Sequence, residues 1–114
     1  MFNSVTLVGR LAGDGELGRA SGDGRTPILR FTLAVDRAYE LDGNTATDFW
    51  PVAIVGPHGV RLVPHMTRGR LVLVQGGAHI NTCKDAGGAR RVCAFVDCRA
   101  LRFLDGNRRW AAPS

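Results

Sequence analysis

The chain opens on Met1-Phe2-Asn3-Ser4-Val5-Thr6-Leu7-Val8-Gly9-Arg10-Leu11, and the second half of this stretch sets the pattern from which the fold follows. Its apolar residues Val5, Leu7 and Leu11 occupy odd positions, with Thr6 and Arg10 at even positions. Because successive side chains of a strand point to opposite faces, this period of two predicts a half-buried strand over residues 5–11.

A cleaner alternation follows at residues 28–36. One face would carry apolar side chains and the other mostly polar ones: Leu29, Phe31, Leu33 and Val35 against Arg30, Thr32, Ala34 and Asp36. We therefore predict a second strand with a core face and a polar working face. The intervening residues 13–27 are rich in Gly, Ser and Asp, which predicts a turn or loop.

The third strand is expected over residues 48–55. Val52 and Ile54 would point one way, and Phe49, Ala53 and Val55 the other. Residues 38–47 carry Asp42-Gly43-Asn44 between two strand patterns, which predicts a hairpin loop with an exposed tip.

The second half of the chain predicts a short helix and two further strands. Gly56-Pro57-His58-Gly59 ends the third strand, and apolar residues between positions 60 and 66 suit a helix that Pro64 limits to two or three turns. A fourth strand is expected from Arg70 to about Ile80 and a fifth from about Arg90 to Leu104, with a hairpin tip at residues 85–88.

This order of elements predicts an all-β domain: a five-stranded Greek-key barrel of the oligonucleotide/oligosaccharide-binding (OB) type, with a helix between strands three and four. A chain of 114 residues with 15 glycines suits one such domain, over residues 1–104. Residues 105–114, which include Trp110, are expected to form a short polar tail.

The charge balance favours a polyanionic partner such as nucleic acid. The formal net charge is +5, and fourteen of the fifteen basic residues are arginine. Arginine both pairs with phosphate and stacks on bases, although a GC-rich genome would produce the same bias without a functional cause.

The sequence predicts neither a catalytic nor a metal site, and no cofactor. Three cysteines without a Cys-x-x-Cys pair are expected to be small buried residues in a reducing cytoplasm. His58 and His65 lack a paired nucleophile, and Gly13-Asp14-Gly15 and Gly76-Gly77 do not match a phosphate loop. No apolar run approaches the ~20 residues of a membrane span.

Several short motifs together resemble the bacterial single-stranded-DNA-binding protein family. They are Asn3, Gly9-Arg10-Leu11, Asp14-Gly15-Glu16-Leu17, Phe31-Thr32-Leu33-Ala34-Val35 with Arg37, Thr47-Asp48-Phe49, Arg68-Gly69 and Phe103-Leu104. The resemblance implies an OB-fold that binds single-stranded DNA with little sequence preference. It also implies a homotetramer, arranged as a dimer of dimers, that protects DNA during replication, recombination and repair in the cytoplasm, at the nucleoid.

The same resemblance suggests which residues bind DNA. Phe49 matches a position where the family has a stacking Trp or Phe, although an extra core aromatic is the alternative. Val55 and Cys83 match positions that are often aromatic, so two platforms are absent, and Trp50 has the parity of a buried residue. The expected DNA-binding residues are Arg10, Arg30, Thr32, Arg37, Tyr39, Phe49, Val55, Arg68, Arg70, Asn81, Lys84 and Arg91, with Arg90 as a further phosphate contact.

Two features leave alternatives open. The family commonly ends in an acidic tip that recruits other proteins, whereas this sequence ends Trp110-Ala111-Ala112-Pro113-Ser114, so we do not expect that recruitment. The absent aromatic platforms also suit an adaptor module of a primosome-like complex, and a barrel that prefers RNA is a further possibility.

Overall fold

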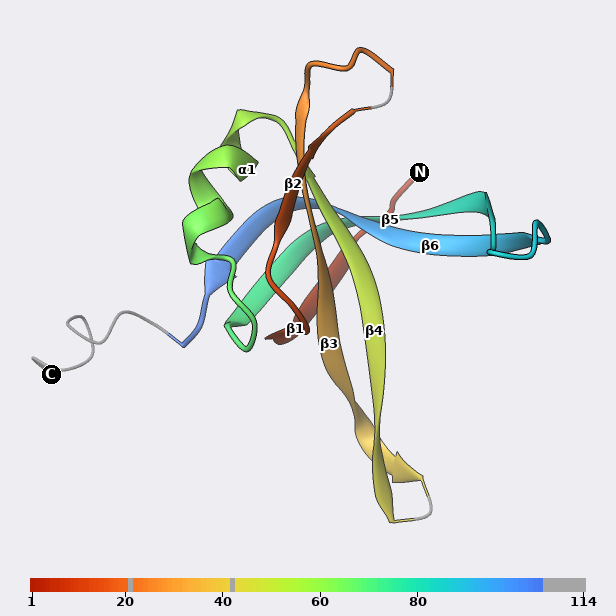
Figure 1. Cartoon of the computed structure of the whole chain (residues 1–114). Helices are drawn as coiled ribbons and strands as arrows, with labels where there is room; N and C mark the ends of the chain where they lie inside the picture. Colours follow the sequence, from red (N-terminus) through yellow and green to blue (C-terminus); the bar gives the residue numbers. More distant parts are fainter. Residues whose placement is uncertain (21, 42, 106–114) are drawn as a thin grey trace, which may run out of the picture.

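The computed structural model describes residues 1–20, 22–41 and 43–105, without the side chains of residues 39–41 and 44. Six strands and one short helix make up the fold (Figure 1). Their bounds are β1 Val5–Leu11, β2 Glu16–Arg19, β3 Pro27–Leu41, β4 Asn44–Val55, α1 Pro57–Leu62, β5 Leu71–Lys84 and β6 Arg90–Phe103. A 3₁₀ turn, η1 (Val63–His65), continues α1.

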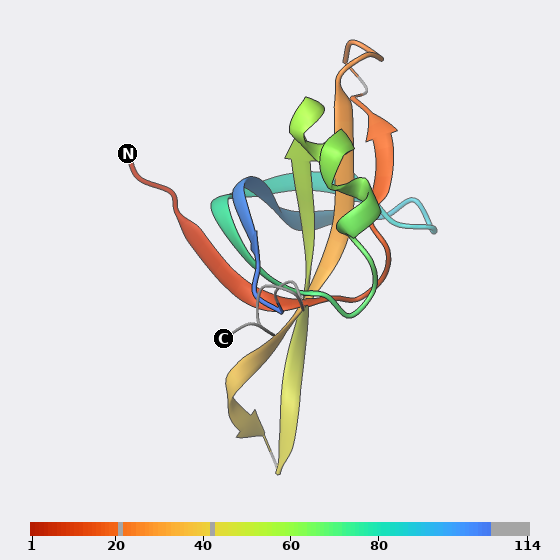
Figure 2. The same ribbon diagram turned by 90° about the vertical axis from the view of Figure 1, so that its left-hand side faces the viewer.

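Five of the strands close a barrel in the order β1-β5-β6-β4-β3, because β3 also pairs with β1. All neighbours are antiparallel except β4 and β6, which run parallel. This closed barrel confirms the predicted OB architecture, with the helix between the third and fourth barrel strands. Figure 2 shows α1 across one end of the barrel.

The short strand β2 corrects the prediction of a loop over residues 13–27. It pairs with the outer edge of β3, with Glu16 opposite Arg30 and Arg19 opposite Pro27. Its three side chains, those of Glu16, Leu17 and Arg19, are all exposed, so its sequence carries no apolar alternation. Pairing with β3, which is a tertiary interaction, creates this strand.

The core lies inside the barrel, on the faces that the alternation predicts. Its buried side chains are Leu11, Leu29, Phe31, Leu33, Val52, Ile54, Met66, Val72, Val74, Val96 and Cys98. Each large aliphatic side chain buried in this way contributes roughly 1.5–3 kcal/mol. Gly9 is required where β1 crosses β3, because an added Cβ would lie 2.2 Å from the Ala34 carbonyl oxygen.

The helix is as short as predicted and begins earlier. α1 starts at Pro57, directly after Gly56, and gives way to the 3₁₀ turn that contains Pro64. Proline suits the first helical position because its missing N–H has no helical partner there. Gly59 packs against Leu29, where a Cβ would lie 2.9 Å from the leucine Cβ. Within the described residues, no helix is long and apolar enough to cross a membrane.

The β3–β4 hairpin projects beyond the barrel, and so does the β5–β6 hairpin, whose outer part over residues 79–94 we call the β5–β6 arm (Figure 1). The strands of β3–β4 continue through the predicted loop 38–47, with Glu40 opposite Thr45, so that loop was predicted too long. Asp42 lies outside the described residues. The arm turns at residues 85–88 as predicted, although β5 runs to Lys84 rather than Ile80.

The cysteines divide between the barrel and the arm. Cys98 is buried in the core as predicted. Cys83 and Cys93, however, are joined by a disulfide across the arm, with their Cα atoms 6.1 Å apart, which corrects the prediction of three free buried thiols. The sequence pattern does not reveal this pair, because only the register of β5 against β6 brings the two residues together.

Candidate functional site

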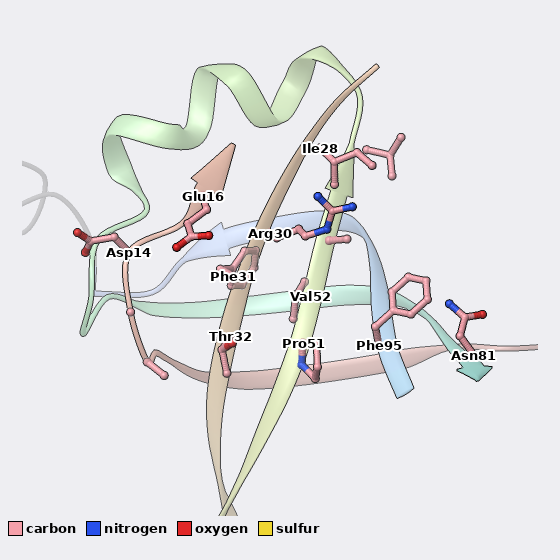
Figure 3. Close-up of a pocket in the computed structure, with 14 residues that line it drawn as sticks. Asp14, Glu16, Ile28, Arg30, Phe31, Thr32, Pro51, Val52, Asn81 and Phe95 are labelled. Carbon is pink, nitrogen blue, oxygen red and sulfur yellow. The ribbon is translucent and has the colours of Figure 1, made fainter. Parts of the chain in front are cut away.

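A groove of about 800 Å³ lies on the outer face of β3, β4 and the base of the β5–β6 arm (Figure 3). It is lined by Ala12, Gly13, Asp14, Glu16, Ile28, Arg30, Phe31, Thr32, Pro51, Val52, Ala53, Val55, Asn81 and Phe95. Four of the predicted DNA-binding residues lie here: Arg30, Thr32, Val55 and Asn81.

The strand register explains why the β3–β4 wall presents this face. Thr32 lies opposite Pro51 and Ala34 opposite Phe49, so their side chains share the outer face. Phe49 is 64% exposed, whereas Val52 is 2% exposed on the inner face. The predicted orientation of Phe49 is therefore confirmed, and it is not a core aromatic.

Trp50 takes the opposite orientation, as its parity predicts. It lies opposite Leu33 on the inner side of the β3–β4 pair and packs, partly buried, against the core. Its ring therefore faces away from the groove. Val55, by contrast, is 55% exposed and lines the groove with an aliphatic side chain.

The second wall of the groove lies at the base of the β5–β6 arm and includes an aromatic residue, Phe95, that sequence reasoning missed. Phe95 lies beside Asn81 at this wall (Figure 3), and its ring stacks on His79 with centroids 5.2 Å apart and planes 19° apart. Phe95 alternates with the buried Val96 and shares the parity of Asp97. That alternation in the last strand is the signal that would have placed it on the outer face.

The charges in the groove have both signs. Arg30 is exposed near the centre, and Asp14 and Glu16 lie together on the side away from Asn81 (Figure 3). Asp14 also accepts a hydrogen bond from the Arg68 backbone N–H at 2.9 Å, which ties the turn after the helix to this edge. An anion would thus find attraction at Arg30 and repulsion at the carboxylate edge.

Three of the predicted basic residues, Lys84, Arg90 and Arg91, lie at the tip of the arm. Arg91 is ion-paired with Asp85 at 2.8 Å and stays 70% exposed, and Lys84 beside it is exposed. The Arg91 hydrogen bond, helped by the Ala89 backbone N–H, lowers the pKa of Asp85. Arg90 lies opposite Lys84, so three basic residues gather on this hairpin end.

The remaining predicted residues lie away from the groove lining. Arg10 on β1 lies opposite Ala34, which in turn lies opposite Phe49. The Arg10 guanidinium donates a hydrogen bond of 3.0 Å to the Gly69 carbonyl. Arg37 pairs with Asp48 at 2.9 Å on the β3–β4 hairpin, and this hydrogen bond lowers the pKa of Asp48. Arg68 is exposed in the turn before β5. The Tyr39 side chain is outside the described part of the chain.

Arg70 has a structural environment. Its guanidinium pairs with Asp105 at 2.8 Å and lies 4.3 Å from the centroid of the Phe103 ring. The Arg70 hydrogen bond lowers the pKa of Asp105, so the end of β6 is tied to the start of β5. Residues 106–114, including Trp110, are outside the described residues.

This arrangement suits binding of a flat, uncharged ring beside a polyanionic backbone. An exposed aromatic ring offers a stacking surface, and the grouped arginines and lysine offer phosphate contacts. Among the described residues, no group of three or more His, Cys, Asp or Glu side chains gathers to hold a metal.

Comparisons with known proteins agree with this geometry. The model of the "Single-strand binding protein family" matches residues 2–104. A single-stranded DNA-binding protein of Clostridium tetani is 34% identical over 108 residues, which cover 94% of this chain and 74% of the relative. One from Thermotoga maritima is 36% identical over 107 residues, 91% of this chain and 74% of the relative.

Solved structures show the same fold. The small single-stranded DNA-binding protein from Streptomyces coelicolor superposes with a TM-score of 0.72 at 24% identity, covering 90% of this chain and 95% of the other. The Plasmodium falciparum SSB, solved in complex with ssDNA, gives a TM-score of 0.75 at 23% identity, covering 92% and 96%. By its barrel and by the match over residues 2–104, this chain belongs to the single-strand binding protein family.

Proposed function

We propose that this protein binds and protects single-stranded DNA, without catalysis and with little preference for base sequence. The observation that carries the proposal is Phe49, a large ring 64% exposed beside the groove in a chain of this family. Phe49 shares the outer face of the β3–β4 pair with Thr32 and Pro51 of the groove, so its exposed ring is open to a stacking base. Replication, recombination and repair are the processes that supply such DNA.

Two kinds of contact would hold the strand. Phe49 would stack on a base, a contact worth roughly 1–3 kcal/mol. Arg30 in the groove, with Lys84, Arg90 and Arg91 at the arm tip, would neutralise phosphates. Stacking accepts any base and phosphate contacts carry no sequence information, so binding by these groups is sequence-tolerant.

Compared with the set expected from sequence, the proposed contacts leave out Arg70 and keep Val55. Arg70 is left out, because Asp105 and Phe103 already occupy its guanidinium. Val55 stays in the set as an aliphatic contact, because it is 55% exposed on the groove. An aliphatic side chain lacks a π surface, so this contact is weaker than a stacked ring.

We further propose that the protein works as a homotetramer in the cytoplasm. The outer face of β1 and β5 pairs Val8, which is 46% exposed, with Leu73, and Phe2 before β1 is 94% exposed. These apolar side chains would be covered by a second copy of the chain. Light scattering tests this: a mass near 12.3 kDa, that of one chain, would exclude the assembly.

Titration of a fluorescent oligothymidine at several salt concentrations tests the function. The affinity should fall steeply with salt, with a slope of about −0.7 in log K against log [salt] for each phosphate neutralised. Mixed-sequence DNA of equal length should bind with similar affinity, and duplex DNA much more weakly. Absent or salt-independent binding would exclude the groove as a DNA site and favour an adaptor role. Matched RNA oligomers distinguish the two nucleic acids.

A further inference from the structure

The stacked pair of His79 and Phe95 is the aromatic feature of the groove that the proposed contacts leave unused. The centroids of the two rings are 5.2 Å apart and their planes 19° apart. Phe95 lines the groove, and the apolar side chains that pack on the barrel core do not include it. The ring is therefore directed toward the groove and not toward the interior.

Strand register places this pair in line with the β3–β4 wall. Thr32 lies opposite Pro51, and His79 lies opposite Phe95. The parallel pairing of β4 with β6 begins at Val52 and Val96, so Pro51 and Phe95 each precede the first pair by one residue. The four side chains thus form a row across four neighbouring strands, which lie about 4.8 Å apart.

Phe49 lies close to this row. It precedes Pro51 by two residues on the same face of β4, a distance along the strand of about 7 Å. Two aromatic residues, the exposed Phe49 and the partly buried Phe95, therefore flank Pro51 on one surface. Pro51 is itself exposed and flat, so it extends the apolar area between them.

Charge distinguishes a base from a phosphate at this place. The Asp97 carboxylate lies 3.8 Å from His79 Nε2 on the same face, and Asp14 and Glu16 line the opposite side of the groove. A phosphate is attracted to Arg30 near the centre of the groove and repelled by these carboxylates, whereas the face of a nucleobase carries no net charge. The floor beside Phe95 therefore favours a base.

We propose that His79 and Phe95 form a second base-stacking platform, which takes one nucleobase of single-stranded DNA beside the base held by Phe49. This inference rests on the proposed function and assigns a further residue pair to it. Asn81, in the next row of the same face, is placed to hydrogen-bond the edge of that base. Cys83 and Cys93, farther along the same face, are tied to each other and offer no π surface.

Substitutions at Phe95 test the platform through affinity for the same fluorescent oligothymidine at fixed salt. Phe95→Leu keeps an apolar side chain and removes the ring, so it should weaken binding about tenfold, as Phe95→Ala should. Phe95→Trp should restore or exceed wild-type affinity. Val92→Ala is the matched control, because Val92 lies on the same strand with the opposite parity and is 76% exposed. It should leave affinity unchanged.

Photocrosslinking gives a direct readout in the unaltered protein. An oligomer that carries 5-iododeoxyuridine should crosslink to Phe95 as well as to Phe49, as located by mass spectrometry of the adduct peptides. This measurement decides the matter even where a Phe95 variant fails to fold, and thermal melting identifies such variants.

The outcomes separate this inference from the proposed function. Wild-type binding with loss of affinity in Phe49→Ala, full affinity in Phe95→Leu and no crosslink at Phe95 would overturn the platform while DNA binding stands. Absence of wild-type binding would instead overturn the proposed function itself.

Discussion

The two walls of the groove are built differently. In the β3–β4 wall, each outward residue alternates with a side chain anchored in the core, such as Leu33 or Val52. Beyond Phe95, the β5–β6 arm leaves the barrel, and even on the face that continues the buried Val96, Ile80 is 73% and Val92 76% exposed. The first wall is held by packing, and the second by its backbone pairing, a disulfide and the ion pair at its tip.

The two walls therefore have different roles in DNA binding. A wall anchored in the core holds a stacking ring in a fixed position without further support. The arm has no core beneath it, and it places its basic residues farther from the barrel. There they can contact further nucleotides of a long DNA strand. We therefore expect the β3–β4 wall to dominate affinity per base and the arm tip to dominate the dependence on salt.

Removal of the Phe49 ring should produce the largest effect. Phe49→Ala deletes an exposed stacking surface and leaves the core intact, so oligothymidine affinity should fall about tenfold or more. Val55→Ala, on the same face of β4, removes only aliphatic contact and should cost about threefold or less. Fluorescence titration of both variants checks the order. If Val55→Ala were the weaker binder, the assignment of stacking to Phe49 would be wrong.

Charge removal at the arm tip should come second. The double substitution Lys84→Gln with Arg90→Gln should lower affinity several-fold at low salt and reduce the slope of log K against log [salt] by about 1.4. Arg61→Gln is the control, since Arg61 is exposed on α1 and does not line the groove. A slope equal to that of the wild type would show that the tip does not touch phosphate.

Thiol reactivity compares the arm with the barrel directly. Burial raises the pKa of the Cys98 thiol to about 11, so almost no thiolate forms at pH 8. After reduction, Cys83 and Cys93 should react with iodoacetamide in the folded protein, while Cys98 reacts only after unfolding. Mass spectrometry of the alkylated peptides measures this. Fast alkylation of Cys98 in the native protein would contradict its place in the core.

Acidification should have the smallest effect, confined to the arm tip. Asp85 accepts hydrogen bonds from the Gly87 and Ala89 N–H groups at 2.9 Å each and pairs with Arg91, so its pKa in the folded state is lowered. Because the Asp85 pKa is lower in the folded than in the unfolded state, the ionised carboxylate stabilises the folded turn at pH values above the unfolded pKa of about 3.9. This stabilisation is lost as the pH falls through the folded-state pKa. Amide exchange at Gly87 and Ala89 should therefore quicken below about pH 4 relative to the intrinsic rate.

The control for this effect is Asp85→Asn, whose turn should show no such change between pH 5 and pH 3. Equal pH dependence in the variant and the wild type would show that another group governs the turn.

Features that depend on alternation within one strand follow from the amino-acid sequence alone. The positions of β1, β3 and β4, the burial of Leu33 and Val52 and the exposure of Phe49 all follow from a period of two. Parity is a local property of the backbone, so a few residues suffice to establish it. The short helix follows equally locally, from the prolines around it.

Features that depend on the pairing of two strands required the three-dimensional structure. β2 exists because it pairs with β3, and the Cys83–Cys93 disulfide and the His79–Phe95 pair exist because β5 and β6 align in one register. Register is set by contacts between residues far apart in sequence, which no single strand pattern contains. For that reason the β3–β4 wall of the groove was predictable, and the aromatic pair on the opposite wall was not.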